Sequence, residues 1–348
     1  MGLSTTTIGS FPKLDYVEVR DWFQTGYKVD YDARYFKDRS IETSLTLATR
    51  DAVLAQVNAG IDIPTEGEQR RENYIYYHCR HLTGIDFEHF TIQEMRSGAW
   101  EERVPTIIGK ITAGEDNFLR YDWQIAQLFT DRPIKITIPG PMTIADTLGN
   151  DYYNDEQLLA KDLAAAINVE IKDLAAAGCK YIQVDEPVFA RYPDKAIKFG
   201  IENLERCFYG TEKDVNRSVH ICCGYPLELD QPDEKYEKAD PASYFTLAKP
   251  LDESKYIDAV SIEDAHRHND LSLLEHFKQT DVILGVIEIA KTRIETYEEI
   301  RERLIAAHEH IDANRLIAAP DCGLGMLDQD ITIAKLESLV KAAQSIGS

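Results

Sequence analysis

Eight short strand-like segments, each followed by sequence suited to a helix, constrain the fold of this chain more than any other feature. They are rich in β-branched residues and lie at 5–12, 61–65, 134–138, 181–184, 217–223, 256–262, 282–289 and 316–319. Alternating strands and helices favour a parallel sheet, and eight such units predict an α/β protein with a closed (β/α)8 TIM barrel. A doubly wound sheet is the alternative, but no G-x-G-x-x-G motif follows the first segment.

The clearest helices are predicted over 41–59, 155–177 and 297–308, and a glycine follows each of the first two. Between the second and third strand segments, residues 70–131 form a longer, aromatic-rich stretch with one extra strand at 105–112. We therefore expect a single barrel domain over residues 1–348 with an insertion at 70–131. Such an insertion could serve as a lid over the site or as a packing or partner surface.

The charge of the chain argues against two classes of partner. Its net charge is −22, from 60 acidic residues against 38 lysines and arginines, which disfavours binding to nucleic acid or to anionic membranes. No apolar run approaches the roughly 18 residues of a membrane span, and the N-terminus lacks a signal-peptide pattern. A cytoplasmic location is expected, where the six cysteines would be buried, metal-binding or catalytic thiols instead of disulfides.

Residues that carry chemistry recur where the predicted strands end, which is where barrels build their sites. They are Ser10, Glu68, Asp185, His220, Cys222, Glu263 and Cys322. His220 and Cys222 would share one face of a strand because side chains alternate with period two. Four of these residues carry groups that bind metals: His220, Cys222, Glu263 and Cys322. Taken singly, each of them is more often structural. Together they form a tetrahedral ligand set for Zn²⁺, whereas Cys223, Cys79, Cys179 and Cys207 are expected to be packed.

Several short motifs occur in the order found in one known family. They lie at residues 5–13, 66–74, 138–144, 183–187, 220–223, 260–264 and 320–325. Together they resemble the C-terminal catalytic domain of cobalamin-independent methionine synthase. The resemblance implies a (β/α)8 barrel and a zinc ion held by His220, Cys222, Glu263 and Cys322. It also implies that the amino and carboxylate groups of homocysteine are held by Ile8, Gly9, Ser10, Glu68 and Asp185; a structural role for the last two is the alternative.

The chemistry of such a site is methyl transfer to a thiol. A free thiol has a pKa near 8.5 and is mostly protonated at neutral pH, so zinc would stabilise the thiolate of homocysteine. The carboxylate of Glu263 is the hardest of the four ligands, and a soft thiolate binds zinc in preference to it. We therefore expect Glu263 to leave the metal when the substrate thiol arrives.

The chain departs from the family pattern on the donor side. It is too short for the additional N-terminal half of the full-length family enzyme. Thr147 stands where the family has a tryptophan that stacks on the pterin, and Ala290 stands where it has a proton-donating histidine. A folate leaving group needs that proton. We therefore expect a donor other than folate polyglutamate, such as a methylated corrinoid protein or another activated methyl donor. His266 and His268 are candidate catalytic replacements, with a plain loop role as the alternative.

Three hypotheses follow from these patterns. The first is a zinc-dependent methyltransferase that converts homocysteine to methionine. The second is zinc-dependent alkyl transfer to a different small thiol, as in coenzyme M transferases. The third is a non-catalytic zinc-binding barrel, although an exchangeable Glu263 would serve no purpose in a purely structural site.

Overall fold

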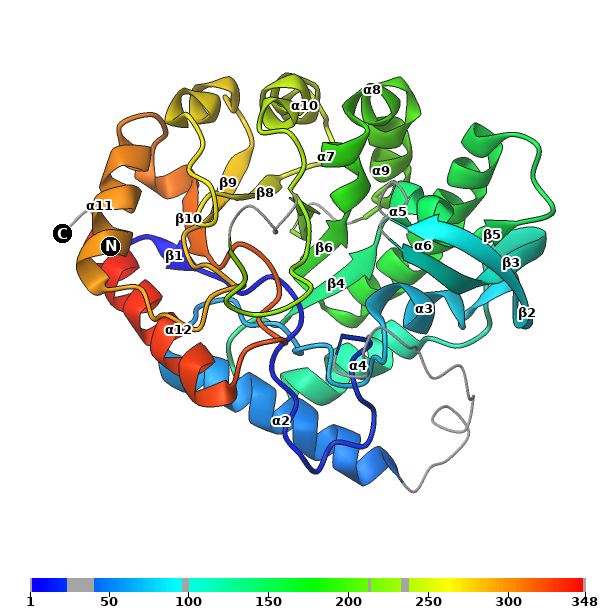
Figure 1. Ribbon diagram of the computed structural model, residues 1–348, viewed down its shortest axis with the longest axis horizontal. Helices are drawn as coiled ribbons and strands as arrows, with labels where there is room; N and C mark the ends of the chain where they lie inside the picture. Colours follow the sequence, from blue (N-terminus) through cyan, green and yellow to red (C-terminus); the bar gives the residue numbers. More distant parts are fainter. Residues whose placement is uncertain (1, 24–40, 96–99, 212–213, 233–237, 347–348) are drawn as a thin grey trace.

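The computed structural model describes residues 2–23, 41–95, 100–211, 214–232 and 238–346, and its centre is a curled parallel sheet (Figure 1). The strands are ordered β1-β10-β9-β8-β7-β6-β4. Their bounds are Ser4–Thr5 for β1, Lys135–Pro139 for β4, Tyr181–Asp185 for β6, Asn216–Ile221 for β7, Ala259–Glu263 for β8, Asp281–Gly285 for β9 and Leu316–Ala319 for β10. Every neighbouring pair is parallel, as strands joined through helices require.

The predicted segment 61–65 joins the two edges of this sheet. Ile63 pairs with Thr6, and Thr65 pairs with Lys135, in both cases parallel. The Ile63 amide donates to the Thr5 carbonyl at 3.0 Å, and the Lys135 amide donates to the carbonyl of Pro64 at 2.9 Å. Pro64 has no amide hydrogen to give the ladder, which accounts for isolated bridges in place of a regular strand. The circle is closed, and the predicted (β/α)8 barrel is confirmed.

Helices cover the outside of the barrel. The long ones are α2 (Glu42–Ala59), α6 (Glu156–Ala177), α11 (Tyr297–His308) and α12 (Gln329–Gln344), and α2 lies beside α12 in Figure 1. Gly60 and Gly178 end α2 and α6 with φ of 102° and 108°, a conformation that glycine adopts without strain. The shorter helices are α3 (Tyr74–Cys79), α4 (Phe118–Gln127), α5 (Pro141–Thr147), α7 (Pro187–Arg191), α8 (Pro193–Lys195), α9 (Ile201–Cys207) and α10 (Ala242–Asp252).

The strands present apolar side chains to the helices and polar ones to the barrel interior. Alternate residues such as Ile138, Val184 and Ile262 belong to the large apolar core shared with the helices. The intervening residues point the other way and are buried: Lys135, Thr137, Gln183, Asp185, His220, Ser261 and Glu263. A period of two therefore delivers a polar interior along the barrel, with Asp185, His220 and Glu263 at its carboxyl end. That interior positions the site described below.

The insertion at 70–131 contains a long hairpin beside the barrel (Figure 1). Strand β2 (Leu82–Met95) pairs antiparallel with β3 (Trp100–Ala113), and β3 pairs with the short strand β5 (Gly149–Asn150). The predicted strand at 105–112 is part of β3, whereas β2 was not predicted. The hairpin contacts the barrel's helices at several points; the side chain of Gln93 donates to the carbonyl of Asp146 in α5 at 2.7 Å, and the Ile111 amide donates to the Tyr153 hydroxyl at 2.9 Å.

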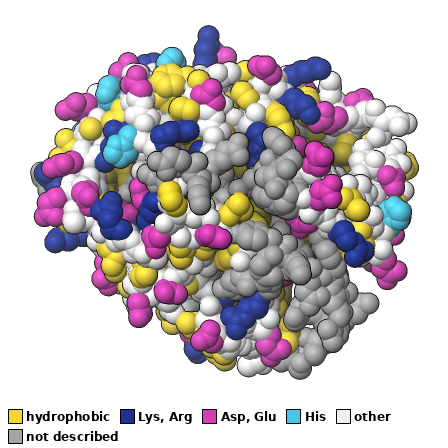
Figure 2. All heavy atoms as spheres, viewed as in Figure 1, with side chains coloured by type: hydrophobic (Ala, Val, Ile, Leu, Met, Phe, Trp, Pro, Cys, Tyr) yellow, Lys and Arg dark blue, Asp and Glu magenta, His cyan; other side chains and the backbone are white. Residues whose placement is uncertain are grey.

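Charged side chains are mixed over the visible face of the molecule, where acidic groups lie among lysines and arginines (Figure 2). The negative net charge therefore does not collect into one acidic surface on this face. Among the described residues, no helix combines the length and the apolar character that a bilayer crossing requires.

Candidate active site

Four predicted metal ligands meet at the carboxyl end of the barrel. His220 lies near the end of β7, Cys222 follows that strand, Glu263 is the last residue of β8 and Cys322 follows β10. One ligand atom from each residue lies within 4.8 Å of the others. The Sγ atoms of Cys222 and Cys322 are 3.8 Å apart, and Nε2 of His220 is 3.3 Å from Sγ of Cys322.

These separations fit a tetrahedral zinc site. Zinc binds sulfur at about 2.3 Å and imidazole nitrogen at about 2.0 Å. The tetrahedral edges that follow are about 3.8 Å between two sulfurs and about 3.5 Å between sulfur and nitrogen. Both thiols are free, and their separation is far too long for a disulfide. The donor set and its spacing therefore suit zinc.

Neighbouring groups set the protonation of His220 and Cys322. Nδ1 of His220 shares a hydrogen bond of 2.9 Å with the Ser261 hydroxyl, which leaves Nε2 directed at the thiols. Burial lowers the pKa of His220 to about 3, with Lys135 and Lys238 adding to the effect, so the ring is neutral. The hydrogen bond that Cys322 donates to Cys222, together with burial, raises the pKa of Cys322 well above its ordinary value. Metal binding would displace that proton.

Glu263 has a partner for each carboxylate oxygen. Oε1 accepts from the Cys223 amide at 3.1 Å, and Oε2 forms an ion pair with Lys238. The Glu263 amide donates to the hydroxyl of Tyr244 in α10 at 3.0 Å. The side chain of Glu263 is 3% exposed and that of Lys238 is 8% exposed, so this ion pair is almost fully out of solvent.

A second carboxylate pair, Glu68 and Asp185, faces the same cavity as the thiols. Glu68 has a left-handed backbone with φ of 55°, and its Oε1 accepts from the Thr137 hydroxyl at 2.8 Å. Gln183 donates to Oδ1 of Asp185 at 2.7 Å and to the carbonyl of Ile8 at 2.9 Å. Burial, reinforced by Glu68, raises the pKa of Asp185 well above its ordinary value. Two buried carboxylates that face one cavity suit a cationic group such as an ammonium.

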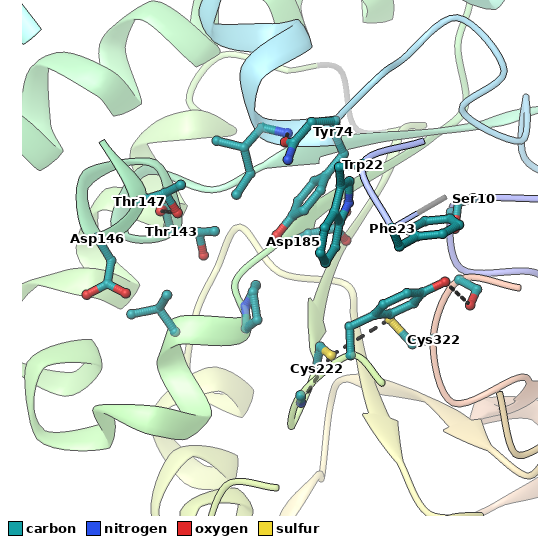
Figure 3. Close-up of a pocket in the computed structure, with 18 of the residues that line it drawn as sticks. Ser10, Trp22, Phe23, Tyr74, Thr143, Asp146, Thr147, Asp185, Cys222 and Cys322 are labelled. Carbon is teal, nitrogen blue, oxygen red and sulfur yellow. Dashed lines mark hydrogen bonds between the residues drawn. The ribbon is translucent and has the colours of Figure 1, made fainter. Parts of the chain in front are cut away.

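The cavity that joins these groups has a volume of about 260 Å³. Ile8, Gly9 and Ser10 form one part of its wall, and Trp22, Phe23 and Tyr225 pack against one another beside the thiols, with ring centroids 5.6 to 6.2 Å apart. Figure 3 shows Trp22, Phe23 and Tyr74 between Ser10 and the opposite wall. These rings add apolar surface to the wall beside the thiols.

The far end of the cavity is built from the hairpin and from α5 and α7. Its lining residues are Gln93, Glu94, Glu102, Thr143, Asp146, Thr147, Val188, Arg191 and Tyr192. Thr143, Asp146 and Thr147 lie opposite Ser10 in Figure 3. The Thr147 hydroxyl donates to the Thr143 carbonyl at 2.8 Å. These lining residues include three carboxylates and one cation, Arg191, which lies 3.5 Å from Asp146.

The two predicted histidines lie away from the cavity wall. Nε2 of His266 accepts from the Ile289 amide at 3.2 Å, and His268 is exposed. Neither is among the residues that line the cavity. Ala290, at the position of the family histidine, is buried.

Residues at the site that were not predicted include Trp22, Phe23, Tyr225 and Lys238. The three aromatic residues line the cavity, and Lys238 contacts the ligand Glu263. Trp22, Phe23 and Lys238 do not stand at the end of a predicted strand, which was the signal that selected the other site residues. Tyr225 follows the strand predicted at 217–223 by two residues, so this signal could have found it.

The barrel and its thiol-lined cavity define an enzyme of the TIM-barrel methyltransferase class, and comparison with known proteins gives the family. The family model described as "Cobalamin-independent synthase, Catalytic domain" matches residues 3–222 and 251–345. This chain belongs to the cobalamin-independent methionine synthase family.

Relatives of similar length support the assignment. A methionine synthase from Thermococcus kodakarensis is 29% identical over 350 residues, covering 99% of this chain and 93% of the relative. The structure of a B12-independent methionine synthase from Shewanella sp. W3-18-1, in complex with selenomethionine, matches with a TM-score of 0.86 and 31% identity over 99% of this chain and 97% of that one. A methyltransferase from Methanosarcina mazei shares the fold, with a TM-score of 0.61 and 12% identity.

Proposed function

We propose that this protein transfers a methyl group to the thiol of homocysteine and forms methionine, with zinc held by His220, Cys222, Glu263 and Cys322. The observation that carries the proposal is the position of the ligand cluster at the wall of the same cavity as Glu68 and Asp185. A small molecule with a thiol and an ammonium group matches those two sites. When bound, zinc would keep the substrate sulfur in its nucleophilic thiolate form.

The chain's own residues would bind and orient the amino acid. Glu68 and Asp185 would pair with its ammonium group, since each is a buried carboxylate at the cavity. Ile8, Gly9 and Ser10 would hold its carboxylate. The carbonyl of Ile8 is fixed by Gln183, and that of Ser10 accepts from the Leu324 amide at 2.8 Å. This loop is therefore held at two points before substrate binds.

The far end of the cavity gives no basic cluster for a polyglutamate tail among its described lining residues. A tail placed there would lie near Glu94 and Asp146, where like charges repel. Thr147 offers no ring for stacking, and the buried Ala290 offers no proton. We infer that the donor lacks a polyglutamate tail and leaves without needing a proton, as a methylated corrinoid protein or another activated methyl donor does. A proton-donating role for His266 or His268 stays a prediction.

The transfer itself is a displacement at carbon. The homocysteine sulfur would form a bond to the methyl carbon, the bond from that carbon to the donor would break, and its electron pair would leave with the donor. The aromatic residues Trp22, Phe23 and Tyr225 would keep water from competing for the methyl group.

Metal analysis and an activity screen test this proposal. The purified protein should hold about one zinc ion per chain. Cys222→Ser should lose it, whereas the neighbouring Cys223→Ser should retain it, because Cys223 instead donates to the Tyr244 hydroxyl at 3.1 Å. Homocysteine would then be incubated with methylfolate as monoglutamate and polyglutamate, with methylcobalamin and with S-methyl donors.

Methionine formed from a donor without a polyglutamate tail is the expected result. Efficient turnover of the polyglutamate would refute the inference on the donor. A folded protein without zinc, or methylation of coenzyme M in preference to homocysteine, would refute the assignment of the acceptor side.

A further inference from the structure

The segment 223–250 falls between the two parts of the chain that match the family model, 3–222 and 251–345. It nevertheless supplies three contacts to the ligand Glu263, through the Cys223 amide, Lys238 and the Tyr244 hydroxyl. The surroundings of this ligand are therefore built by a part of the chain outside the family match. We propose that Lys238 is a positioning residue that holds the Glu263 carboxylate when the substrate thiol takes its place at the metal; this inference rests on the proposed function.

The contacts show a carboxylate already placed for that role. Lys238 and the Cys223 amide occupy both carboxylate oxygens of Glu263, while the same side chain remains within 4.8 Å of the other three ligand atoms. Glu263 thus lies between two sets of partners, the metal position on one side and an ammonium group on the other. A small movement of the carboxylate is enough to exchange one set for the other.

Charge explains why a lysine is needed there. Zinc with two thiolates and one carboxylate carries a net formal charge of minus one. When a third thiolate replaces Glu263, the metal and its ligands keep that charge, and the released carboxylate adds another negative charge to a buried site. An unpaired buried charge is costly. The Lys238 ammonium neutralises the released carboxylate and so favours the exchanged state.

The position of Lys238 is fixed by its neighbours. The amide of Ala239 donates to the Cys223 carbonyl at 2.9 Å, which ties Lys238 to the residue that follows the ligand Cys222. Upstream, the Asp230 amide donates to the Ala290 carbonyl at 2.8 Å, and the carboxylate of Asp230 accepts from the amide and hydroxyl of Thr292. The segment is thereby anchored over the loop where the family histidine is replaced by alanine.

A second carboxylate, that of Asp321, lies near Lys238. Asp321 accepts from the amides of Asp264, Ala265 and His266, whereas Lys238 forms an ion pair with Glu263.

The test compares Lys238→Met, which removes the charge, with Lys238→Arg, which keeps it. The matched control is Lys249→Met in the same segment, where the lysine is 74% exposed. Zinc affinity is measured by competition with a chelator, homocysteine affinity by calorimetry on the zinc-loaded protein, and the number of sulfur ligands by X-ray absorption with and without homocysteine.

In Lys238→Met, no ammonium group should compete with the metal for the Glu263 carboxylate. We expect zinc affinity equal to or above that of the wild type and homocysteine affinity lower by about tenfold or more, the value of a hydrogen bond between charged groups. Homocysteine should add less sulfur to the metal shell than in the wild type. Lys238→Arg should restore the exchange, and Lys249→Met should behave like the wild type.

Two results would overturn the role of Lys238 while leaving the proposed function intact. One is unchanged homocysteine affinity in Lys238→Met, and the other is a loss of zinc affinity, which would mean that the lysine merely supports the ligand. If Lys238→Met does not fold, Lys238→Gln gives the same readouts. In a Glu263→Gln background the released group is neutral, so the Lys238 substitution should no longer weaken homocysteine binding. Failure of the wild type to bind zinc or homocysteine would instead refute the proposed function.

Discussion

Gly9 offers a way to disturb the substrate site without touching a polar side chain. A Cβ atom added at Gly9 would lie 2.8 Å from Oε1 of Glu68, whereas ordinary contact begins at 3.4 Å. The carboxylate of Glu68 would therefore have to move by about 0.6 Å, the difference between these two distances. That oxygen accepts from the Thr137 hydroxyl at 2.8 Å and lies 3.6 Å from Nη1 of Arg71. Gly9→Ala thus forces Glu68 out of the position that these groups define.

The size of the effect follows from what Glu68 is proposed to bind. A hydrogen bond to a charged group contributes about 1.5 to 3 kcal/mol, and about 1.4 kcal/mol corresponds to a tenfold change in affinity. Loss of the bond between Glu68 and the substrate ammonium should therefore weaken homocysteine binding by about 10- to 150-fold. Zinc content should stay at the wild-type level because Glu68 is not one of the four clustered ligands.

Calorimetry with homocysteine and the zinc-loaded protein measures this directly and needs no methyl donor. Gly109→Ala is the matched control, since a Cβ there meets nothing closer than Cα of Gly84 at 3.6 Å. Homocysteine affinity within twofold of the wild type in Gly9→Ala would refute the assignment of Glu68 to the ammonium group.

Two further predictions concern the metal and the stability of the fold. Ser261→Ala removes the hydrogen bond to Nδ1 of His220 and should weaken zinc binding by about 10- to 100-fold in a chelator competition; unchanged affinity would show that the ring needs no such support. Burial raises the pKa of Glu170 from its ordinary 4.5 to about 7, with Asp173 and Asp116 adding to the effect. The folded state therefore holds a proton between these pH values that the unfolded state has lost, and stability falls as pH rises through this window. Glu170→Gln should stabilise the protein by about 3 kcal/mol at pH 8 in urea unfolding, since each pH unit of pKa shift corresponds to about 1.4 kcal/mol, and equal stability of the two proteins at pH 8 would contradict this.

The sequence predicts the barrel well because its strands and helices differ in period and in their end signals. The helix predicted at 297–308 coincides with α11, whose capping box joins Thr296 and Glu299. The strand predicted at 282–289 was too long, since β9 ends at Gly285. Its apolar run continues because Val286, Ile287 and Ile289 are buried in the following loop. An apolar run predicts burial, and burial alone does not separate a strand from a packed loop.

The hairpin strand β2 escaped prediction for a related reason. Its pairing with β3 shifts register between Thr83 and Ile85 and again between Asp86 and Phe90. Each shift breaks the alternation of apolar and polar residues from which a strand is read.

At the site, too, residues that follow a sequence pattern were predicted and residues that follow none were missed. Strand ends placed His220, Cys222, Glu263 and Cys322 correctly at one edge, because the barrel brings those ends together. Lys238 follows no strand and belongs to no periodic segment. Its place beside Glu263 arises only from tertiary packing, which a single sequence does not display.

The pairing of β1 with β10 also constrains the order in which the chain can fold. The Thr6 amide donates to the carbonyl of Ala318 at 3.1 Å, and the Leu3 amide donates to that of Ala343 at 3.0 Å. During synthesis on the ribosome, the first strand can pair early with the segment 61–65, but its other neighbour, β10, is made only after more than 300 further residues. Until then the growing sheet has open edges, which are prone to pair with other chains. Slow closure and a dependence on chaperones are the expected result of joining the barrel at that seam.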